Sequence, residues 1–203
     1  MKEYPPIQRE IVNCPIYAFD KKDGSNIRSE WNRKQGLYKF GSRNRLLGED
    51  QPFLTEAPDI IRNKYEKDLS DIFRKERFER VICFFEFWGP NSFAGTHIQE
   101  PHDVTLFDVN PHKKGILDPA AYLKLFGHLD ICKLLYRGNC NSEFVELVRS
   151  GQLGGMTFEG VVCKAKNPKN TPMPIMFKVK NRAWVEKLKE CCKGNDQLFN
   201  TLL

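Results

Sequence analysis

Residues 81–87 constrain the fold of this chain more than any other stretch, because a single acid interrupts an otherwise apolar and aromatic run. A run of this length and composition is typical of a buried strand. Glu86 is the exception, since a carboxylate in such a strand is unfavourable unless it has a partner or a ligand. The run therefore predicts a buried strand whose acid either pairs with a lysine or arginine or contacts a bound molecule.

The remaining elements are predicted from short apolar runs, which indicate strands, and from apolar residues at helical spacing. The expected strands cover residues 16–19, 36–40, 81–87, 104–109, 158–164 and 175–180. The expected helices cover residues 57–75, 118–136, 141–151 and 183–192. A polar loop is expected at residues 167–172, between the last two strands. This mixture predicts an α+β protein.

The tetrapeptide Lys21-Lys22-Asp23-Gly24 directly follows the first expected strand. A lysine amine becomes a nucleophile when burial or neighbouring positive charge lowers its pKa. Gly24 permits a tight turn and the close approach of a ligand, while Asp23 and Asn26 can hold the loop or contact a sugar. By itself the tetrapeptide also fits a basic turn without a catalytic role.

Length, charge and cysteine content limit the class of protein. We expect residues 1–203 to form a single domain, because the chain shows no repeat, low-complexity segment or linker. A net charge of +6 suits a polyanionic substrate or a nucleoside triphosphate. No apolar run reaches the length of a membrane span, and the N-terminus lacks the apolar core of a signal peptide. Seven scattered cysteines are expected to be free thiols, which predicts a cytoplasmic or nuclear protein rather than a secreted one.

Further short motifs follow the lysine tetrapeptide in a fixed order. They are Ser42-Arg43, the F-E-x-x-G form around Glu86, Glu159-Gly160-Val161-Val162 and Lys178-Val179-Lys180. In this order they resemble the motifs of the covalent nucleotidyltransferase superfamily, which comprises RNA ligases, DNA ligases and mRNA capping enzymes. Between Asp20 and Lys180 the chain most resembles the ATP-dependent RNA ligases, because Asn26 and the F-E-x-x-G form match that branch. The resemblance implies a nucleotidyltransferase domain with mainly antiparallel sheets flanked by helices.

The resemblance also implies which residues perform the chemistry. Lys21 would attack the α-phosphorus of ATP and form a lysine–AMP bond. Lys178 and Lys180 share one face of a strand and would contact the phosphate, where their charge would also help to depress the pKa of Lys21. Two lysines on one face would otherwise indicate a solvated surface. Lys22 is the rival nucleophile, but only Lys21 places Asp23 and Gly24 at the family spacing.

The other matched residues would bind the nucleotide and a metal. The resemblance implies that Glu86 hydrogen-bonds the ribose, with Asn26 beside the nucleotide, and that Arg43 contacts the ribose or the RNA 5′ end. Phe107 would stack on adenine, although it also fits a core aromatic. Asp20 would accept a hydrogen bond from the adenine amino group, where many relatives carry glutamate. Glu159 would bind Mg²⁺ or Mn²⁺, which bridges to the triphosphate.

The implied activity is ATP-dependent RNA ligation, in which AMP passes to an RNA 5′-phosphate and a 3′-hydroxyl then seals the ends. A DNA ligase, a GTP-dependent capping guanylyltransferase and a catalytically silent nucleic-acid-binding domain are the alternatives. The chain ends soon after Lys180, so no C-terminal OB fold or other accessory domain is expected. The sequence then fits a minimal ligase, a fragment, or a chain whose RNA-end recognition is completed by a partner protein.

Overall fold

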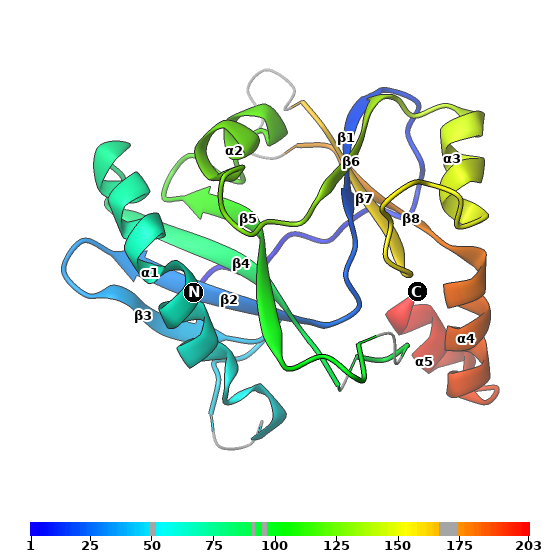
Figure 1. Cartoon of the computed structure of the whole chain (residues 1–203), viewed down its shortest axis with the longest axis horizontal. Coiled ribbons are helices and arrows are strands. Elements are labelled where there is room, and N and C mark those ends of the chain that lie inside the picture. Colours follow the sequence, from blue (N-terminus) through cyan, green and yellow to red (C-terminus); the bar gives the residue numbers. More distant parts are fainter. Residues whose placement is uncertain (49–51, 91, 95–96, 167–173) are drawn as a thin grey trace.

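Two four-stranded antiparallel sheets form the framework of the computed structural model, which describes residues 1–48, 52–90, 92–94, 97–166 and 174–203 (Figure 1). The first sheet has the strand order β6-β1-β7-β8 and the second has the order β3-β2-β4-β5. In the first sheet the strands are β1 (Pro15–Asp20), β6 (Leu134–Asn139), β7 (Gly160–Ala165) and β8 (Met176–Lys180). In the second they are β2 (Ser25–Asn32), β3 (Gly36–Gly41), β4 (Arg80–Trp88) and β5 (Asp103–Pro111). The α+β class with mainly antiparallel sheets is therefore confirmed.

Helices pack on the outer side of each sheet (Figure 1). On the second sheet lie α1 (Ala57–Lys75), which follows the short 3-10 helix η1 (Pro52–Leu54), and α2 (Pro119–Phe126). On the first sheet lies α3 (Ser142–Arg149). The chain closes with α4 (Arg182–Cys192) and α5 (Asp196–Leu202), which contact each other. No helix of the described ranges is long and apolar enough to cross a membrane.

A hydrophobic cluster packs on each of the two sheets. On the second sheet, Trp31 and Phe85 pack against α1, and the Trp31 indole donates to Ser70 Oγ at 2.8 Å. On the first sheet, Phe177 packs with Phe144 and Val148 of α3. Burying each such side chain contributes roughly 1.5–3 kcal/mol. Phe19 of β1 belongs to the larger of these two clusters, so the two sheets are also packed together along part of their length.

One predicted helix and one unpredicted strand distinguish the structure from the sequence expectation. The helix predicted for residues 118–136 ends at Phe126, with Gly127 as its C-cap. Before the predicted end at residue 136 the chain has already entered β6, which continues to Asn139 and pairs with β1. The apolar residues of β6 occur at a spacing that a short window cannot distinguish from a helix. The polar β2, which pairs with β3 and β4, was not predicted. The loop predicted at residues 167–172 lies outside the described residues.

Candidate active site

A cavity of about 810 Å³ opens between the two sheets. Strands β1, β7 and β8 line it from one side, and β2, β4 and β5 line it from the other, together with residues 4–7 and Arg9 near the N-terminus. The cavity wall includes every residue that the sequence assigned to the site: Asp20, Lys21, Asn26, Arg43, Glu86, Phe107, Glu159, Lys178 and Lys180. The structure therefore brings the predicted site residues together, although their roles remain predictions.

Three charged side chains meet on the floor of this cavity. Lys21 directly follows β1 and donates from Nζ to Glu159 Oε2 at 2.9 Å. Lys180, at the end of β8, donates from Nζ to the other oxygen of Glu159. Glu159 is only 3% exposed and precedes β7, whose first residue is paired with Lys180. A single buried carboxylate thus contacts one lysine in the loop after β1 and a second lysine at the end of β8.

The electrostatics of this cluster differ from the sequence expectation for Lys21. Burial alone would lower the pKa of Lys21, but Glu159 and Glu86 together outweigh it and raise that pKa. Burial and the nearby Lys21 charge lower the pKa of both Lys178 and Lys180 to about 8. Burial would raise the pKa of Glu159, but Lys21 and Lys180 hold it below its usual value. The neighbouring acids thus favour the ammonium form of Lys21, which is opposite to the lowered pKa that the sequence predicted.

The loop after β1 sends its two lysines in different directions. Asp23 is buried and accepts a hydrogen bond from the Ala94 amide, which ties the loop to the chain beyond β4. A Cβ at Gly24 would lie 2.3 Å from the Phe87 carbonyl oxygen, so the backbone of this loop touches β4. The ammonium of Lys22 lies 3.5 Å from the Trp88 ring centroid, a cation–π contact. Lys21 alone of this pair contacts Glu159 in the described structure.

Glu86 and Asn26 lie opposite each other on β4 and β2. Burial raises the pKa of Glu86 to about 7, although Lys21 acts in the opposite direction. In the described part of the chain, no lysine or arginine forms an ion pair with Glu86, which argues against the ion-pair alternative. The Oδ1 atom of Asn26 is buried and has no hydrogen-bond partner among the described residues. Unsatisfied polar groups at a cavity wall are typical of a site that binds a polar ligand.

The remaining predicted residues occupy different parts of the wall. Phe107, on β5, lines the cavity and also packs against the core of the second sheet, so both interpretations of it agree with its position. Asp20 already accepts hydrogen bonds from Thr157, at 2.9 Å from its amide and 3.1 Å from its hydroxyl. Arg43 is exposed in the loop that follows β3.

Tyr4 and Lys164 are among the cavity-wall residues that sequence reasoning missed. Lys164 is a charged residue inside the apolar strand β7, which is the same kind of signal that identified Glu86. Tyr4 carries no comparable signal, because an isolated tyrosine before the first strand fits any surface segment.

The residues present fit a divalent cation only if a ligand supplies part of its coordination. Among the described residues, no group of three or more histidine, cysteine, aspartate or glutamate side chains could hold a metal ion. Glu159 is the buried carboxylate at the cavity floor. Magnesium is commonly held by one or two carboxylates together with substrate phosphates and water, so Glu159 suits this type of site.

Structural comparison relates the chain to the RNA ligase of Naegleria gruberi. A variant with AMP and Mn superposes with a TM-score of 0.63 at 18% identity, covering 85% of this chain and 51% of that chain. The same ligase with PPi gives a TM-score of 0.61 at 18% identity, covering 87% of this chain and 52% of that chain. No protein-family model matches the sequence, and a search of curated proteins found no match. The chain thus shares its fold with part of these RNA ligase structures and spans about half the length of their chains.

Proposed function

We propose that this chain is an ATP-dependent RNA ligase, or the adenylyltransferase domain of one, with Lys21 as its nucleophile. The observation that carries the proposal is the cluster of Lys21, Glu159 and Lys180 at the floor of a cavity between two sheets. The structural neighbours support it, because their fold is shared and one of them was solved with ATP and Mn. The acids and lysines also argue against a silent binding domain, which needs no buried lysine–carboxylate–lysine cluster.

In the first half-reaction, Nζ of Lys21 forms a bond to the α-phosphorus of ATP, and the bond from that phosphorus to the bridging oxygen breaks. Pyrophosphate leaves with the electron pair of the broken bond. Before the attack, the Lys21 ammonium passes one proton to solvent water in the cavity, which frees the lone pair on Nζ. Lys178 and Lys180 stabilise the charge that develops on the α-phosphate. Glu159 would hold Mg²⁺ or Mn²⁺, which supplies Lewis-acid stabilisation of the phosphate oxygens when bound.

In the second half-reaction, AMP passes from Lys21 to a 5′-phosphate on RNA, and a 3′-hydroxyl then displaces AMP to join the ends. Arg43 lines the cavity and is exposed, so it can contact an RNA end that enters. Asn26 and Glu86 would bind the ribose of the nucleotide, Phe107 would stack on adenine, and Asp20 would accept from the adenine amino group. A partner protein or a further domain would add to the recognition of RNA ends.

The test is incubation with α-labelled ATP or GTP plus Mg²⁺ or Mn²⁺, followed by a denaturing gel. We expect covalent labelling from ATP, because the resemblance is to the ATP-dependent branch; labelling from GTP instead would indicate a capping guanylyltransferase. Lys21→Ala should abolish labelling, since no other amine contacts Glu159 from that loop. Lys22→Ala is the matched control and should retain most of it. Labelling that survives the loss of Lys21 would show that the nucleophile is wrong.

A further inference from the structure

The segment formed by residues 1–9 crosses from one sheet to the other along the cavity. At one end, Nη1 of Arg28 on β2 donates to the Met1 carbonyl at 3.0 Å. At the other end, Gln8 donates from its amide to the Met176 carbonyl at 3.1 Å, and its carbonyl accepts from the Lys178 amide at 3.3 Å. Between these anchors Tyr4 lies on the cavity wall. The segment is therefore part of the site and is fixed to both sheets.

Tyr4 contacts the aromatic residue that is proposed to stack on the nucleotide base. Its ring lies edge-on to Phe107, with 5.0 Å between centroids and an interplanar angle of 84°. It also lies edge-on to Phe84, at 4.9 Å and 68°. Edge-to-face contacts of this kind contribute about 0.5–1.5 kcal/mol beyond burial. Tyr4 thus restricts where the ring of Phe107 can move.

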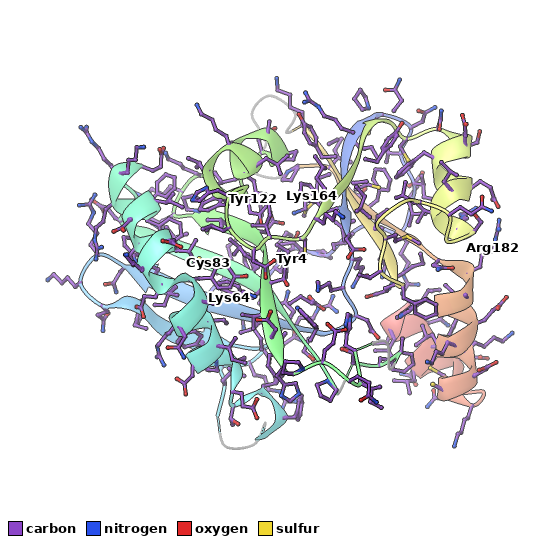
Figure 2. The ribbon with its side chains drawn as sticks, in the orientation of Figure 1. Tyr4, Lys64, Cys83, Tyr122, Lys164 and Arg182 are labelled. Carbon is purple, nitrogen blue, oxygen red and sulfur yellow. The ribbon has the colours of Figure 1, made fainter. Side chains whose placement is uncertain are left out.

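A buried ion pair holds Tyr4 in turn. The Tyr4 hydroxyl donates to Asp108 Oδ2 at 2.5 Å, and Lys164 Nζ donates to the same oxygen at 2.8 Å. Lys164 also donates to the Phe107 carbonyl at 2.9 Å. Asp108 is 1% exposed and Lys164 is 2% exposed, and they belong to β5 and β7. The pair therefore links the two sheets beside the cavity, near the centre of the view in Figure 2, where Tyr4 and Lys164 are labelled.

We propose that Tyr4 is a positioning residue for the base of the bound nucleotide, acting through the ring of Phe107. The hydroxyl bond to Asp108 fixes the Tyr4 ring, and that ring holds Phe107 against the cavity. The triphosphate is bound elsewhere, at Lys21, Lys178 and Lys180, so Tyr4 should affect recognition of the base and leave recognition of the phosphates unchanged. The inference rests on the proposed function for the identity of the nucleotide.

The experiment compares Tyr4→Phe and Tyr4→Ala in the full chain, with Tyr38→Phe as the matched control. The Tyr38 hydroxyl also donates to a carboxylate, Glu30 Oε1 at 2.6 Å, but neither residue lines this cavity. Equilibrium dialysis with labelled ATP in the absence of metal measures nucleotide binding without turnover. Competition by inorganic tripolyphosphate measures binding of the phosphates alone.

We expect Tyr4→Phe to weaken ATP binding several-fold, because the ring is no longer fixed by its bond to Asp108 and holds Phe107 less firmly. Tyr4→Ala should weaken it further because the ring is lost as well. Binding of tripolyphosphate should stay at the wild-type level in both variants, and Tyr38→Phe should bind both ligands normally. Unchanged ATP binding in both Tyr4 variants, an equal loss for ATP and tripolyphosphate, or no ATP binding by the wild type would overturn the inference. A wild-type chain that binds ATP without labelling Lys21 would instead overturn the proposed function and leave the Tyr4 comparison valid.

Discussion

At the scale of single residues, the ionised carboxylate of Glu86 destabilises the folded state. Burial raises its pKa from 4.5 to about 7, so the unfolded chain loses this proton at lower pH than the folded chain does. Between these two pKa values the folded state binds more protons, and stability contributed by Glu86 falls as the pH rises. Above about pH 7 the protein therefore carries an unfavourable charge on a partly buried side chain.

Glu86→Gln should raise the free energy of unfolding by about 1–3 kcal/mol above about pH 7 and have little effect below about pH 4.5. Under the proposed function the same variant should bind ATP less tightly, because it loses a contact to the ribose. Urea unfolding at both pH values, with the exposed Glu190→Gln as control, measures the first effect. A variant less stable than the wild type at the higher pH would mean that a stabilising partner holds the Glu86 carboxylate.

At the scale of elements, the β7–β8 pair positions Glu159 and Lys180, and it depends on one glycine. Gly160 has a φ of +136°, and a Cβ there would lie 2.2 Å from the Val179 carbonyl oxygen. Any side chain at this position would both strain the backbone and push the two strands apart. The glycine after Glu159 is therefore required by the close approach of β8.

Gly160→Ala should lower the free energy of unfolding by about 1–3 kcal/mol. It should also reduce covalent labelling by more than the unfolded fraction of the variant accounts for. The second effect follows because the strands would separate where Glu159 meets Lys180. Gly154→Ala is the matched control, since nothing lies within 4 Å of its added Cβ. Thermal unfolding and labelling of both variants provide the comparison, and wild-type behaviour of Gly160→Ala would contradict the packing argument.

The helix with strong apolar periodicity and the strand with an apolar run were predictable from the sequence. The polar strand, which depends on pairing with neighbouring strands, was not. The predicted helix at residues 57–75 coincides with α1, and the run at 81–87 lies within β4. Strand β2 is rich in polar residues, and buried Arg28 and Glu30 become acceptable only through partners that the fold supplies. The site followed the same division: ordered motifs predicted Lys21, Glu159 and Lys180, whereas the position of Tyr4 depends on tertiary contacts with Asp108 and Phe107.

At the scale of the whole molecule, the cavity has a buried floor and a charged, exposed rim. Glu159 and its two lysines lie at the floor, while Arg9 and Arg43 line the same cavity as exposed residues. A nucleotide held at the floor is screened little by salt, because its partners are largely removed from solvent. Under the proposed function, an RNA would instead bind through these exposed cations, and each phosphate contact would release counterions.

We therefore predict that salt separates the two steps of the proposed reaction. With about three phosphate contacts to single-stranded RNA, binding should weaken roughly 20-fold between about 50 and about 200 mM salt. Formation of lysine–AMP should change far less over the same range, because only the small ligand in the cavity is involved. Sealing of 5′-phosphorylated RNA should follow the binding curve and not the labelling curve. RNA binding, sealing and labelling are measured on one preparation across the salt series.

Arg43→Ala should reduce the slope of RNA binding against salt by the amount expected for one lost phosphate contact, and it should leave the salt dependence of labelling unchanged. Sealing that tracks labelling throughout the series would show that this domain holds its RNA by contacts other than the exposed rim.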